Sequence, residues 1–294
     1  MSAAPAPRPA SVAFQGEPGA FSEEAAVRLL GDTVRRVPAA SFENLFALVS
    51  SGEVDAALAP FENSLVGSVH RCYDLLLGSS LSILAECILP IRHHLIGCRG
   101  GSFAAVRTVA SHPVALAQCD RFFTAHPHLL RDAADDTAAS VRRVSEAADP
   151  ARAALGSARA ARLYGGEILR HDLQDHRENY TRFLLLGTSP VDTADGDKIS
   201  LAVQLDHQPG ALHRALAPFA RNGIDLLRIE SRPIVGEPWR YLFYLDLRGS
   251  TREPKVREAL AELAGTAVSV RRLGCYPGAA APFREGSIGD TLVR

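Results

Sequence analysis

Residues 189–197 read S-P-V-D-T-A-D-G-D, and this short stretch separates two regions whose apolar residues follow different patterns. Proline, glycine and three aspartates in nine residues are typical of a polar, turn-rich linker. A chain of 294 residues and 31.5 kDa is long enough for two domains. The sequence therefore predicts one domain on each side of this linker.

Before the linker, short apolar runs alternate with helical patterns. Val12–Phe14 is strand-like, and Val54–Ala59 is a second apolar run that we expect Pro60 to end. Val106–Ala110 leads into Ser111-His112-Pro113, which predicts a strand followed by a helix with Ser111 as its N-cap. This alternation predicts α/β layers with a largely parallel sheet.

After the linker the pattern changes to that of a small α+β domain. The order of predicted elements is β-α-β-β-α-β, which is ferredoxin-like. The predicted elements are Ile199–Leu205, Ala211–Ala220, Ile224–Ile229, Tyr241–Leu247, Val256–Leu263 and Ala267–Leu273. Residues 1–10 and 279–294 are predicted to be flexible tails.

Composition narrows the class of protein. The formal net charge is -1 and no basic run appears, which argues against a nucleic-acid partner. No stretch approaches the roughly 20 apolar residues that span a bilayer, and no signal-like apolar core is present, so we expect a cytoplasmic protein without membrane contact. The five cysteines contain no C-x-x-C pair, which predicts reduced structural thiols and no metal site.

Two polar constellations come early in the first region. Residues 15–22, Q-G-E-P-G-A-F-S, form a glycine-rich turn whose N–H groups could hold an anion, or which could be only a tight connection. Residues 60–64, P-F-E-N-S, follow an apolar strand, where ligands gather in open α/β sheets. The alternative there is a turn in which Asn63 and Ser64 cap the next segment.

Two further constellations come later. Gln118 follows Ser111 by seven residues, about two helical turns, so the two side chains can share a face, although Ser111 could simply cap the helix. Residues 179–183, N-Y-T-R-F, enter the apolar run Leu184–Leu186 and set the Thr181 hydroxyl beside a cation, Arg182. The alternative is a strand edge with an exposed arginine.

Together these motifs resemble the prephenate dehydratase family. Q-G-E-P-G-A-F-S, P-F-E-N-S, S-H-P with Gln118-Cys119, Asp136-Thr137 and N-Y-T-R-F occur in the family's order. Residues 68–77, S-V-H-R-C-Y-D-L-L-L, also resemble the branch shared with plant arogenate dehydratases. The second region resembles the ACT regulatory domain, through Gly210-Ala211-Leu212, residues 230–233 (E-S-R-P) and the aromatic strand 241–244.

The resemblance implies a two-lobed α/β catalytic domain, similar to a periplasmic binding protein, followed by a ferredoxin-like α+β ACT domain. The catalytic domain would span 11–190, with lobes 11–89 plus 171–190 and 90–170, and the ACT domain would span 197–278. Catalytic residues carried over from the family are Thr181, Asn63, Ser111 and Gln118. Substrate-binding residues carried over, two of them in supporting positions, are Arg182, Thr137, Ser64 and Phe183.

The implied reaction converts prephenate into phenylpyruvate. Loss of CO2 and water makes the ring aromatic, so no cofactor is needed. We expect the Thr181 hydroxyl to hydrogen-bond the departing hydroxide, helped by the field of Arg182, while the other polar residues orient the substrate. An apolar, closing cleft would favour loss of CO2 from a poorly solvated carboxylate.

For the second domain, the family implies feedback by phenylalanine bound at a dimer interface, within a homodimer or homotetramer. Gly210, Ala211 and Leu212 would offer backbone groups to the amino acid. The residues that would shape the pocket are Glu230, Ser231, Arg232 and Pro233. The chain departs from the family's I-N-L at Asp225, which either favours the ligand's ammonium or weakens its carboxylate contacts.

Three other functions stay open at this point. An arogenate dehydratase would use the same leaving group on a substrate with an amino group in place of the keto group. A non-catalytic amino-acid sensor could retain the same architecture. A hydrolase could use Ser64 or Ser111 as a nucleophile, although no G-x-S-x-G sequence flanks either serine.

Overall fold

The computed structural model describes residues 9–188, 192–193, 195–234 and 236–279. These residues form two compact units. One contains Pro9–Ser79 and Cys87–Leu184, and the other contains the described residues of Ser80–Glu86 and Leu185–Ala280. None of the described helices is both long and apolar enough to cross a bilayer.

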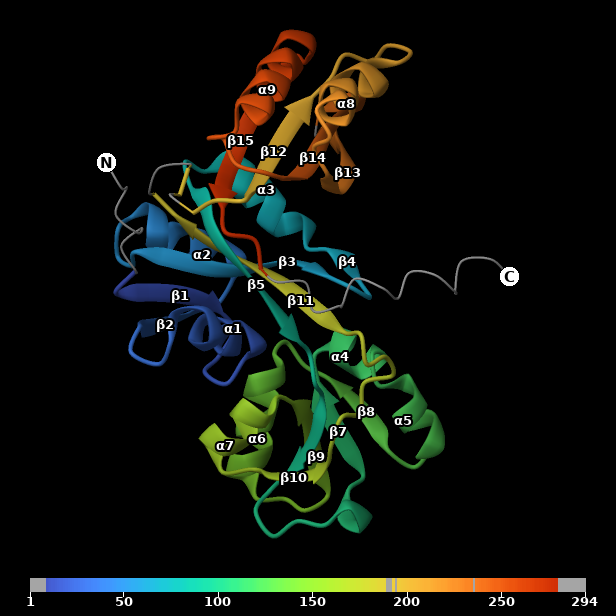
Figure 1. The fold of residues 1–294 in the computed structure, drawn as a ribbon. Helices are drawn as coiled ribbons and strands as arrows, with labels where there is room; N and C mark the ends of the chain where they lie inside the picture. Colours follow the sequence, from blue (N-terminus) through green and yellow to red (C-terminus); the bar gives the residue numbers. More distant parts are fainter. Residues whose placement is uncertain (1–8, 189–191, 194, 235, 280–294) are drawn as a thin grey trace. The chain divides into compact units, whose positions relative to one another are not determined.

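A 6-stranded sheet organises what we call the first lobe (Figure 1). Its central strands follow the order β2-β1-β3-β11-β5, and β4 pairs with β3. The strands are β1 (Ser11–Gln15), β2 (Arg35–Ala39), β3 (Ala56–Asn63), β4 (Gly67–Ser68), β5 (Ser82–Pro90) and β11 (Tyr180–Gly187). The helices between them are α1 (Phe21–Leu30), α2 (Phe42–Ser50) and α3 (His70–Gly78).

A 5-stranded sheet of order β10-β6-β9-β7-β8 organises the second lobe. Its strands are β6 (His94–Gly97), β7 (Thr108–Ser111), β8 (Leu130–Ala133), β9 (Arg152–Gly156) and β10 (Glu167–Arg170). Its helices are α4 (Pro113–Ala117), α5 (Asp120–Ala125), α6 (Thr137–Ala147) and α7 (Ala158–Tyr164), with a short 3-10 turn at Phe103–Ala105. The chain therefore crosses between the lobes twice, at residues 91–93 and 171–179.

Three local predictions for this region were wrong. The sheets are mixed rather than largely parallel, because β6 runs antiparallel to both β9 and β10. Pro60 does not end its strand: β3 continues to Asn63. Ser111 does not cap α4 either, because it is the last residue of β7, and the His112 side chain accepts the Val114 N–H instead.

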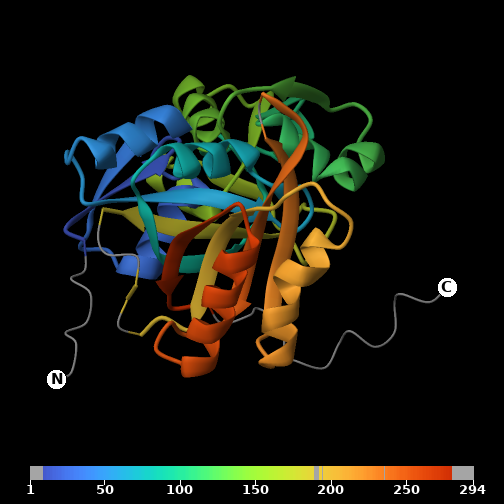
Figure 2. The ribbon, with the colours of Figure 1, turned by 90° about the horizontal axis from the view of Figure 1, so that it is seen from above.

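The last part of the chain forms a 4-stranded antiparallel sheet of order β13-β14-β12-β15. Its elements are β12 (Lys198–Gln204), α8 (Ala211–Arg221), β13 (Leu226–Ile234), β14 (Glu237–Arg248), α9 (Pro254–Thr266) and β15 (Ser269–Tyr276). This is the predicted β-α-β-β-α-β order. Both helices pack side by side, as Figures 1 and 2 show.

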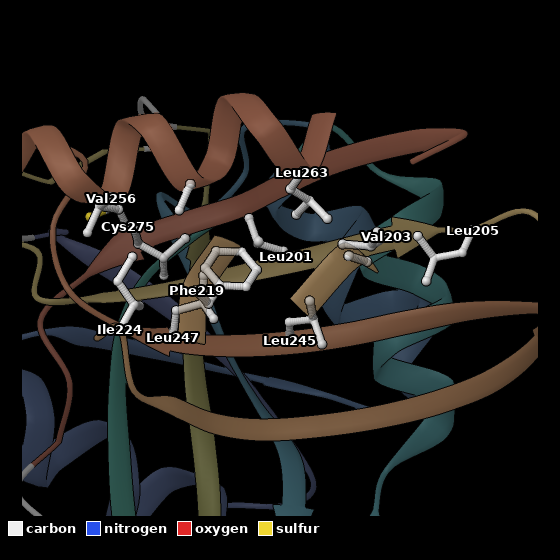
Figure 3. Packing of buried hydrophobic residues seen from close by; sticks show 13 residues of the cluster. Leu201, Val203, Leu205, Phe219, Ile224, Leu245, Leu247, Val256, Leu263 and Cys275 are labelled. Atoms are coloured by element: carbon white, nitrogen blue, oxygen red, sulfur yellow. The ribbon is translucent and has the colours of Figure 1, made fainter. Parts of the chain in front are cut away.

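The core of this domain lies between the two helices and one face of its sheet (Figure 3). Leu201 and Val203 alternate along β12, and Leu245 and Leu247 do so along β14, so all four point to the same face. Phe219 of α8 packs among them. Burying apolar side chains of this size stabilises the fold by roughly 1.5–3 kcal/mol each.

The predicted linker lies partly outside the described residues, since 189–191 and 194 are not described. Its described part runs beside β15: Asp192 forms a bridge with Cys275, and the Thr193 N–H donates to the Cys275 carbonyl at 2.8 Å. The stretch is thus a polar connection, part of which pairs with the sheet of the last domain.

The glycine-rich turn of residues 15–22 packs against the second lobe. A Cβ at Gly19 would lie 2.9 Å from the Ala160 Cα of α7, so only glycine permits this approach. The turn's amides are also used internally, because the Gly16 N–H donates to Ala39 and the Gly19 N–H donates to the Glu23 carboxylate. The Gly16 and Gly19 N–H groups are therefore used within the protein, and this part of the turn serves as a tight connection between β1 and α1.

Two bidentate ion pairs reinforce the same contact between the lobes. Arg142 of α6 donates to Glu17 at 2.8 and 3.0 Å, and Arg159 of α7 donates to Glu23 at 2.9 and 3.1 Å. Burial opposes the ionisation of Glu23, but the hydrogen bonds from Arg159, the Gly19 N–H and Arg36 lower its pKa overall. These carboxylates are therefore charged near neutral pH and hold the lobes together.

We predict that Gly19→Ala lowers the free energy of unfolding by roughly 2–5 kcal/mol, through positive-φ strain and overpacking against Ala160. Gly165→Ala is the matched control, because Gly165 also has positive φ but a Cβ there meets open space. The control should cost about 1 kcal/mol. Urea unfolding of both variants measures the difference, and equal costs would show that the close approach is unimportant.

Candidate active site

A cavity of about 270 Å³ lies between the two lobes and brings together residues from both. The first lobe, with the adjoining crossover, contributes Phe21, Ser22, Pro60, Asn63, Val66, Gly67, Ser68, Val69, Ile91, His93, Thr181 and Phe183. The second lobe contributes His112, Val114, Ala115, Gln118 and Thr137.

Five of the eight predicted residues of the catalytic domain line this cavity. Asn63 is the last residue of β3, and Thr181 and Phe183 lie on the neighbouring strand β11. Gln118 follows α4 as its C-cap, and Thr137 is the first residue of α6. Segments far apart in the sequence are thus brought to one cavity, and the N-Y-T-R-F and E-N-S segments share it.

Ser111 does not line the cavity. Its side chain is fully buried, and its Oγ donates to the Leu155 carbonyl at 2.8 Å. Because α4 starts only at Pro113 and is five residues long, the spacing argument that placed Ser111 and Gln118 on one helical face does not apply. In this structure Ser111 joins β7 to β9 rather than facing a ligand.

Arg182 also points away from the cavity. Successive side chains of a strand face opposite sides, so Arg182 lies on the face of β11 opposite to Thr181 and Phe183. Its guanidinium lies 3.7 Å from the Glu62 carboxylate and is 10% exposed. The expected cation beside the Thr181 hydroxyl is therefore directed elsewhere.

Ser64 holds the two strands of the site together. Its hydroxyl donates to the Glu178 carbonyl at 2.7 Å and accepts from the Tyr180 N–H at 3.0 Å. Its own N–H donates to the Tyr180 carbonyl at 2.9 Å. The Ser64 hydroxyl is thus used between backbone groups, and in the part of the chain that the structure describes no histidine or carboxylate is bonded to it that could activate it as a nucleophile.

Asn63 fixes the direction of the Thr181 hydroxyl. The Leu65 and Val66 N–H groups donate to the Asn63 Oδ1 at 3.0 and 3.1 Å, so its Nδ2 must point the other way. That Nδ2 lies 3.1 Å from the Thr181 Oγ1, and it shares its two hydrogens between this oxygen, the Asn179 Oδ1 at 2.8 Å and the Tyr180 carbonyl at 3.1 Å. Because an amide nitrogen only donates, the Thr181 hydrogen is not directed at Asn63 and is left to point into the cavity that Thr181 lines.

Two residues of the site were missed by the sequence reasoning. Asn179 is fully buried; its Oδ1 accepts from the Asn63 Nδ2 at 2.8 Å, and its Nδ2 donates to the Gln118 Oε1 at 2.9 Å. The His93 Nε2 lies 3.0 Å from the same Gln118 oxygen. Asn179 opens the N-Y-T-R-F motif and could have been singled out, whereas no pattern marks His93.

Burial sets the protonation state of His93. The ring is 2% exposed and packs edge-on against Phe21. Desolvation lowers the pKa of His93 to about 4, opposed in part by the hydrogen bond to Gln118. The imidazole is therefore neutral near pH 7.

No charged side chain of lysine, arginine, aspartate or glutamate lines the cavity, as far as the chain is described. Two helices instead begin at its wall: Phe21 and Ser22 are the first residues of α1, and Thr137 is the first of α6. Helix N-termini carry unpaired N–H groups and partial positive charge. At the start of α6 the Asp136 carboxylate already accepts the Ala139 N–H at 2.8 Å, so an anion in this cavity would meet the remaining N–H groups of the two helix starts.

A second cavity, of about 360 Å³, is lined mainly by residues of α6, of β8 and of the loop between them. Its wall includes Asp132, Asp135, Arg143 and Arg152, and Arg152 is paired with Asp132 at 3.1 Å. None of the predicted site residues lines it. The cavity between the lobes is therefore the candidate active site.

No cysteine is among the described residues that line the cavity between the lobes. All five cysteines are buried and free of disulfides. Burial raises the pKa of Cys119, the cysteine after Gln118, to about 12, so its thiol is protonated near neutral pH. The described residues also contain no group of three or more His, Cys, Asp or Glu side chains placed to hold a metal ion.

A smaller cavity, of about 130 Å³, lies at the start of α8 in the last domain. Ala211 and Leu212 line it, together with Tyr241 and Phe243 of β14. The E-S-R-P segment, residues 230–233, pairs directly with residues 241–244 of β14 but does not line the cavity itself. Gly210 is the N-cap of α8 in the left-handed conformation, which favours glycine.

Asp225 lies outside this small cavity. It follows the C-terminal end of α8, whereas Ala211 begins that helix, and a helix of eleven residues is about 16 Å long. Its carboxylate is 62% exposed and lies 3.4 Å from the Arg248 guanidinium. Within one chain, Asp225 and the Gly210–Leu212 segment therefore cannot contact the same small ligand.

Comparisons with known proteins agree with this architecture. The sequence model of prephenate dehydratase matches residues 12–191, and that of the ACT domain matches residues 199–265. Arogenate dehydratase/prephenate dehydratase 2 of Arabidopsis thaliana, a chloroplastic protein, is 40% identical over 90% of this chain and 72% of its own length. The bifunctional chorismate mutase/prephenate dehydratase of Escherichia coli K12 is 34% identical over 92% of this chain and 72% of its own length.

Two solved structures resemble the whole chain. Prephenate dehydratase of Arthrobacter aurescens in complex with L-Phe has a TM-score of 0.82 and 32% identity, covering 90% of this chain and 89% of its own. GqqA, described as a novel type of quorum quenching acylase, has a TM-score of 0.84 and 33% identity, covering 92% of this chain and 98% of its own. The chain thus belongs to the prephenate dehydratase family of lyases, with an ACT domain at its C-terminal end.

Proposed function

We propose that the cavity between the lobes binds prephenate and converts it into phenylpyruvate, and that Thr181 assists the departure of the hydroxyl. One observation carries this assignment: the Thr181 hydroxyl accepts a hydrogen bond from Asn63 and so presents its own hydrogen to a cavity with no charged side chain in its described wall. Family membership supports the reaction, and the position of the hydroxyl supports Thr181 as the donor.

The bond changes balance without a cofactor. The bond between the ring and its carboxylate breaks and releases CO2, and its electron pair enters the ring. The ring then expels its hydroxyl, which takes up one proton to leave as water. Thr181 would stabilise the charge that develops on this oxygen through a short hydrogen bond, with the proton supplied ultimately by solvent.

The uncharged wall suits the decarboxylation. A cation against the ring carboxylate would stabilise the reactant and hold its negative charge in place. Neutral donors at the start of α1 and α6 can bind the two carboxylates with less stabilisation of that charge. We therefore transfer the electrostatic role expected of Arg182 to these helix ends, and propose that Arg182 supports β11 through its contact with Glu62.

The last domain is proposed to bind phenylalanine. The support is the cavity at Ala211 and Leu212, together with the Arthrobacter structure that contains L-Phe. Because Asp225 and this cavity lie at opposite ends of α8, a site using both needs two chains, which supports a homodimer or a larger assembly. The domain boundaries 11–190 and 197–278 and a cytoplasmic location stay predictions.

Arogenate dehydratase is the second candidate, because the plant relatives at 40% identity carry that name. Arogenate has an ammonium where prephenate has a keto group. The described wall of the cavity has no aspartate or glutamate to pair with that ammonium, so its chemistry favours prephenate.

An acylase activity, as described for GqqA, has weaker support here. Acyl transfer needs an activated nucleophile and an adjacent base. Ser111 is buried against Leu155, and Ser64 bonds only to the backbone of residues 178 and 180. A purely sensory protein is also disfavoured, because it would have no need of an oriented hydroxyl in the first domain.

We predict that Thr181→Ala lowers kcat for prephenate by about tenfold to thousandfold with a modest change in KM, because the lost donor acts mainly in the transition state. Thr181→Ser keeps the hydroxyl and should retain most of the activity. Thr124→Ala, at an exposed position of α5, is the control for the substitution itself. Phenylpyruvate formation is the readout, and a near-normal kcat in Thr181→Ala would remove Thr181 from this role.

We predict a kcat/KM at least tenfold higher for prephenate than for arogenate, because an ammonium buried without a carboxylate partner weakens binding. Purified protein supplied with each substrate in turn, with product formation followed separately, measures the ratio. A ratio near one, or in favour of arogenate, would assign the chain to the second candidate.

We predict that millimolar phenylalanine raises the midpoint of thermal unfolding and that tyrosine does so less. A ligand present at a hundredfold excess over its dissociation constant stabilises the bound fold by about 2.7 kcal/mol. The measurement is a thermal melt with each amino acid and with neither. Equal midpoints in all three samples would contradict phenylalanine binding.

A further inference from the structure

We propose that His93 and Asn179 are positioning residues, which turn the amide of Gln118 so that its NH2 group faces the substrate. This proposal rests on the proposed function of the cavity. Neither residue belongs to the set carried over from the family motifs. One series of hydrogen bonds leads from the backbone through Asn63 and Asn179 to Gln118 at the cavity.

The series of hydrogen bonds starts at the Asn63 Oδ1, an atom that can only accept. The N–H groups of Leu65 and Val66 both donate to Asn63, so the atom they meet is its carbonyl oxygen and its NH2 group lies on the other side. That NH2 group donates to the Asn179 Oδ1 at 2.8 Å. The orientation of Asn179 is therefore determined by that of Asn63.

The orientation of Asn179 in turn determines that of Gln118. With its oxygen used by Asn63, Asn179 presents its NH2 group to Gln118 and donates at 2.9 Å to the Oε1. Asn179 is fully buried, so water does not compete for these bonds. The Gln118 oxygen therefore faces Asn179, and its NH2 group is the part left to contact a ligand in the cavity.

His93 closes the chain from the other side. The Gln118 Oε1 is an acceptor, so the His93 Nε2, at 3.0 Å, must carry the hydrogen. The Nδ1 is then an unprotonated acceptor, and it is buried with no hydrogen-bond partner among the described residues. Two donors thus hold one oxygen of Gln118, and a rotation of its amide would break both bonds.

The position of these residues ties the arrangement to the junction of the lobes. His93 lies in the first crossover and Asn179 in the second, and the two crossovers are bonded directly, since the His93 N–H donates to the Gln174 Oε1 at 3.0 Å. Asn63 belongs to the first lobe and Gln118 to the second. All hydrogen bonds of this series can therefore form together only when the lobes have their present arrangement.

The test is a double-mutant cycle on kcat for prephenate. We expect His93→Phe, which keeps a ring but loses the donor, to lower kcat about tenfold. In a Gln118→Ala background the same substitution should change kcat less than twofold, because His93 acts only through Gln118. If the fold-changes in kcat caused by the two substitutions simply multiply in the double variant, the proposal is overturned.

Two further variants separate positioning from simple packing. His93→Gln places an amide NH2 near the original Nε2 and should recover at least half of the lost activity. His94→Phe is the matched control, because His94 is also buried but donates nothing to Gln118, and its kcat should stay within twofold of the parent. A His93→Gln protein no better than His93→Phe would overturn the proposal.

A third readout needs no turnover. Nitrogen-15 NMR of the histidines at pH 7 should show His93 protonated at Nε2 only, identified by its loss in His93→Phe. Protonation at Nδ1 would overturn the proposal. If the parent protein fails to turn over prephenate, the proposed function fails, while this spectrum still decides whether His93 donates to Gln118.

The pH dependence of unfolding is a fourth, independent readout. The folded-state pKa of His93 lies below 6.5, so the unfolded chain binds more protons and stability should fall as the pH falls from 6.5 to about 4. His94, whose pKa is also lowered by burial, is present in both proteins and cancels. His93→Phe should therefore lose less stability than the parent over this range, and identical slopes would contradict a neutral His93.

Discussion

The donation of two backbone N–H groups to the oxygen of Asn63 is the constraint on which the site depends. The oxygen and the nitrogen of an amide side chain have nearly the same shape, so packing alone does not fix which is which. Two backbone N–H donors fix it, because they can bond only to the oxygen. Once Asn63 is oriented, the hydrogen of Thr181 and the amides of Asn179 and Gln118 follow in sequence. A turn of ordinary backbone geometry after β3 thus determines which polar atoms meet the substrate.

The described wall of the cavity offers the substrate oriented neutral donors instead of charged side chains. A cation in the cavity would attract a dianionic substrate strongly, but it would also stabilise the carboxylate that has to lose its electrons. The described wall instead offers hydroxyl and amide donors and the starts of α1 and α6. Charges are used nearby for another purpose: Arg142 and Arg159 pair with Glu17 and Glu23 and join the lobes.

Much of the architecture could be predicted from the sequence because apolar spacing determines it. The β-α-β-β-α-β order of the last domain and the assembly of Asn63, Gln118, Thr137, Thr181 and Phe183 around one cavity were expected. The errors came from single-residue geometry. Because side chains alternate along a strand, Arg182 points away from Thr181. The strand that ends at Ser111 buries the Ser111 hydroxyl. Neither orientation can be read from a sequence motif. His93 could not have been found, because its partners come from distant segments.

The buried polar chain also connects the two crossovers to the cavity. A buried donor or acceptor that loses its partner costs about 1–3 kcal/mol, so the removal of one member leaves its neighbours unsatisfied. His93 and Asn179 lie where the lobes join, and their bonds reach Gln118 in one lobe and Asn63 in the other. Any relative movement of the lobes must then break or strain these bonds. The same contacts that hold the lobes in register therefore set the direction of the donors, and the site is complete only in the joined arrangement.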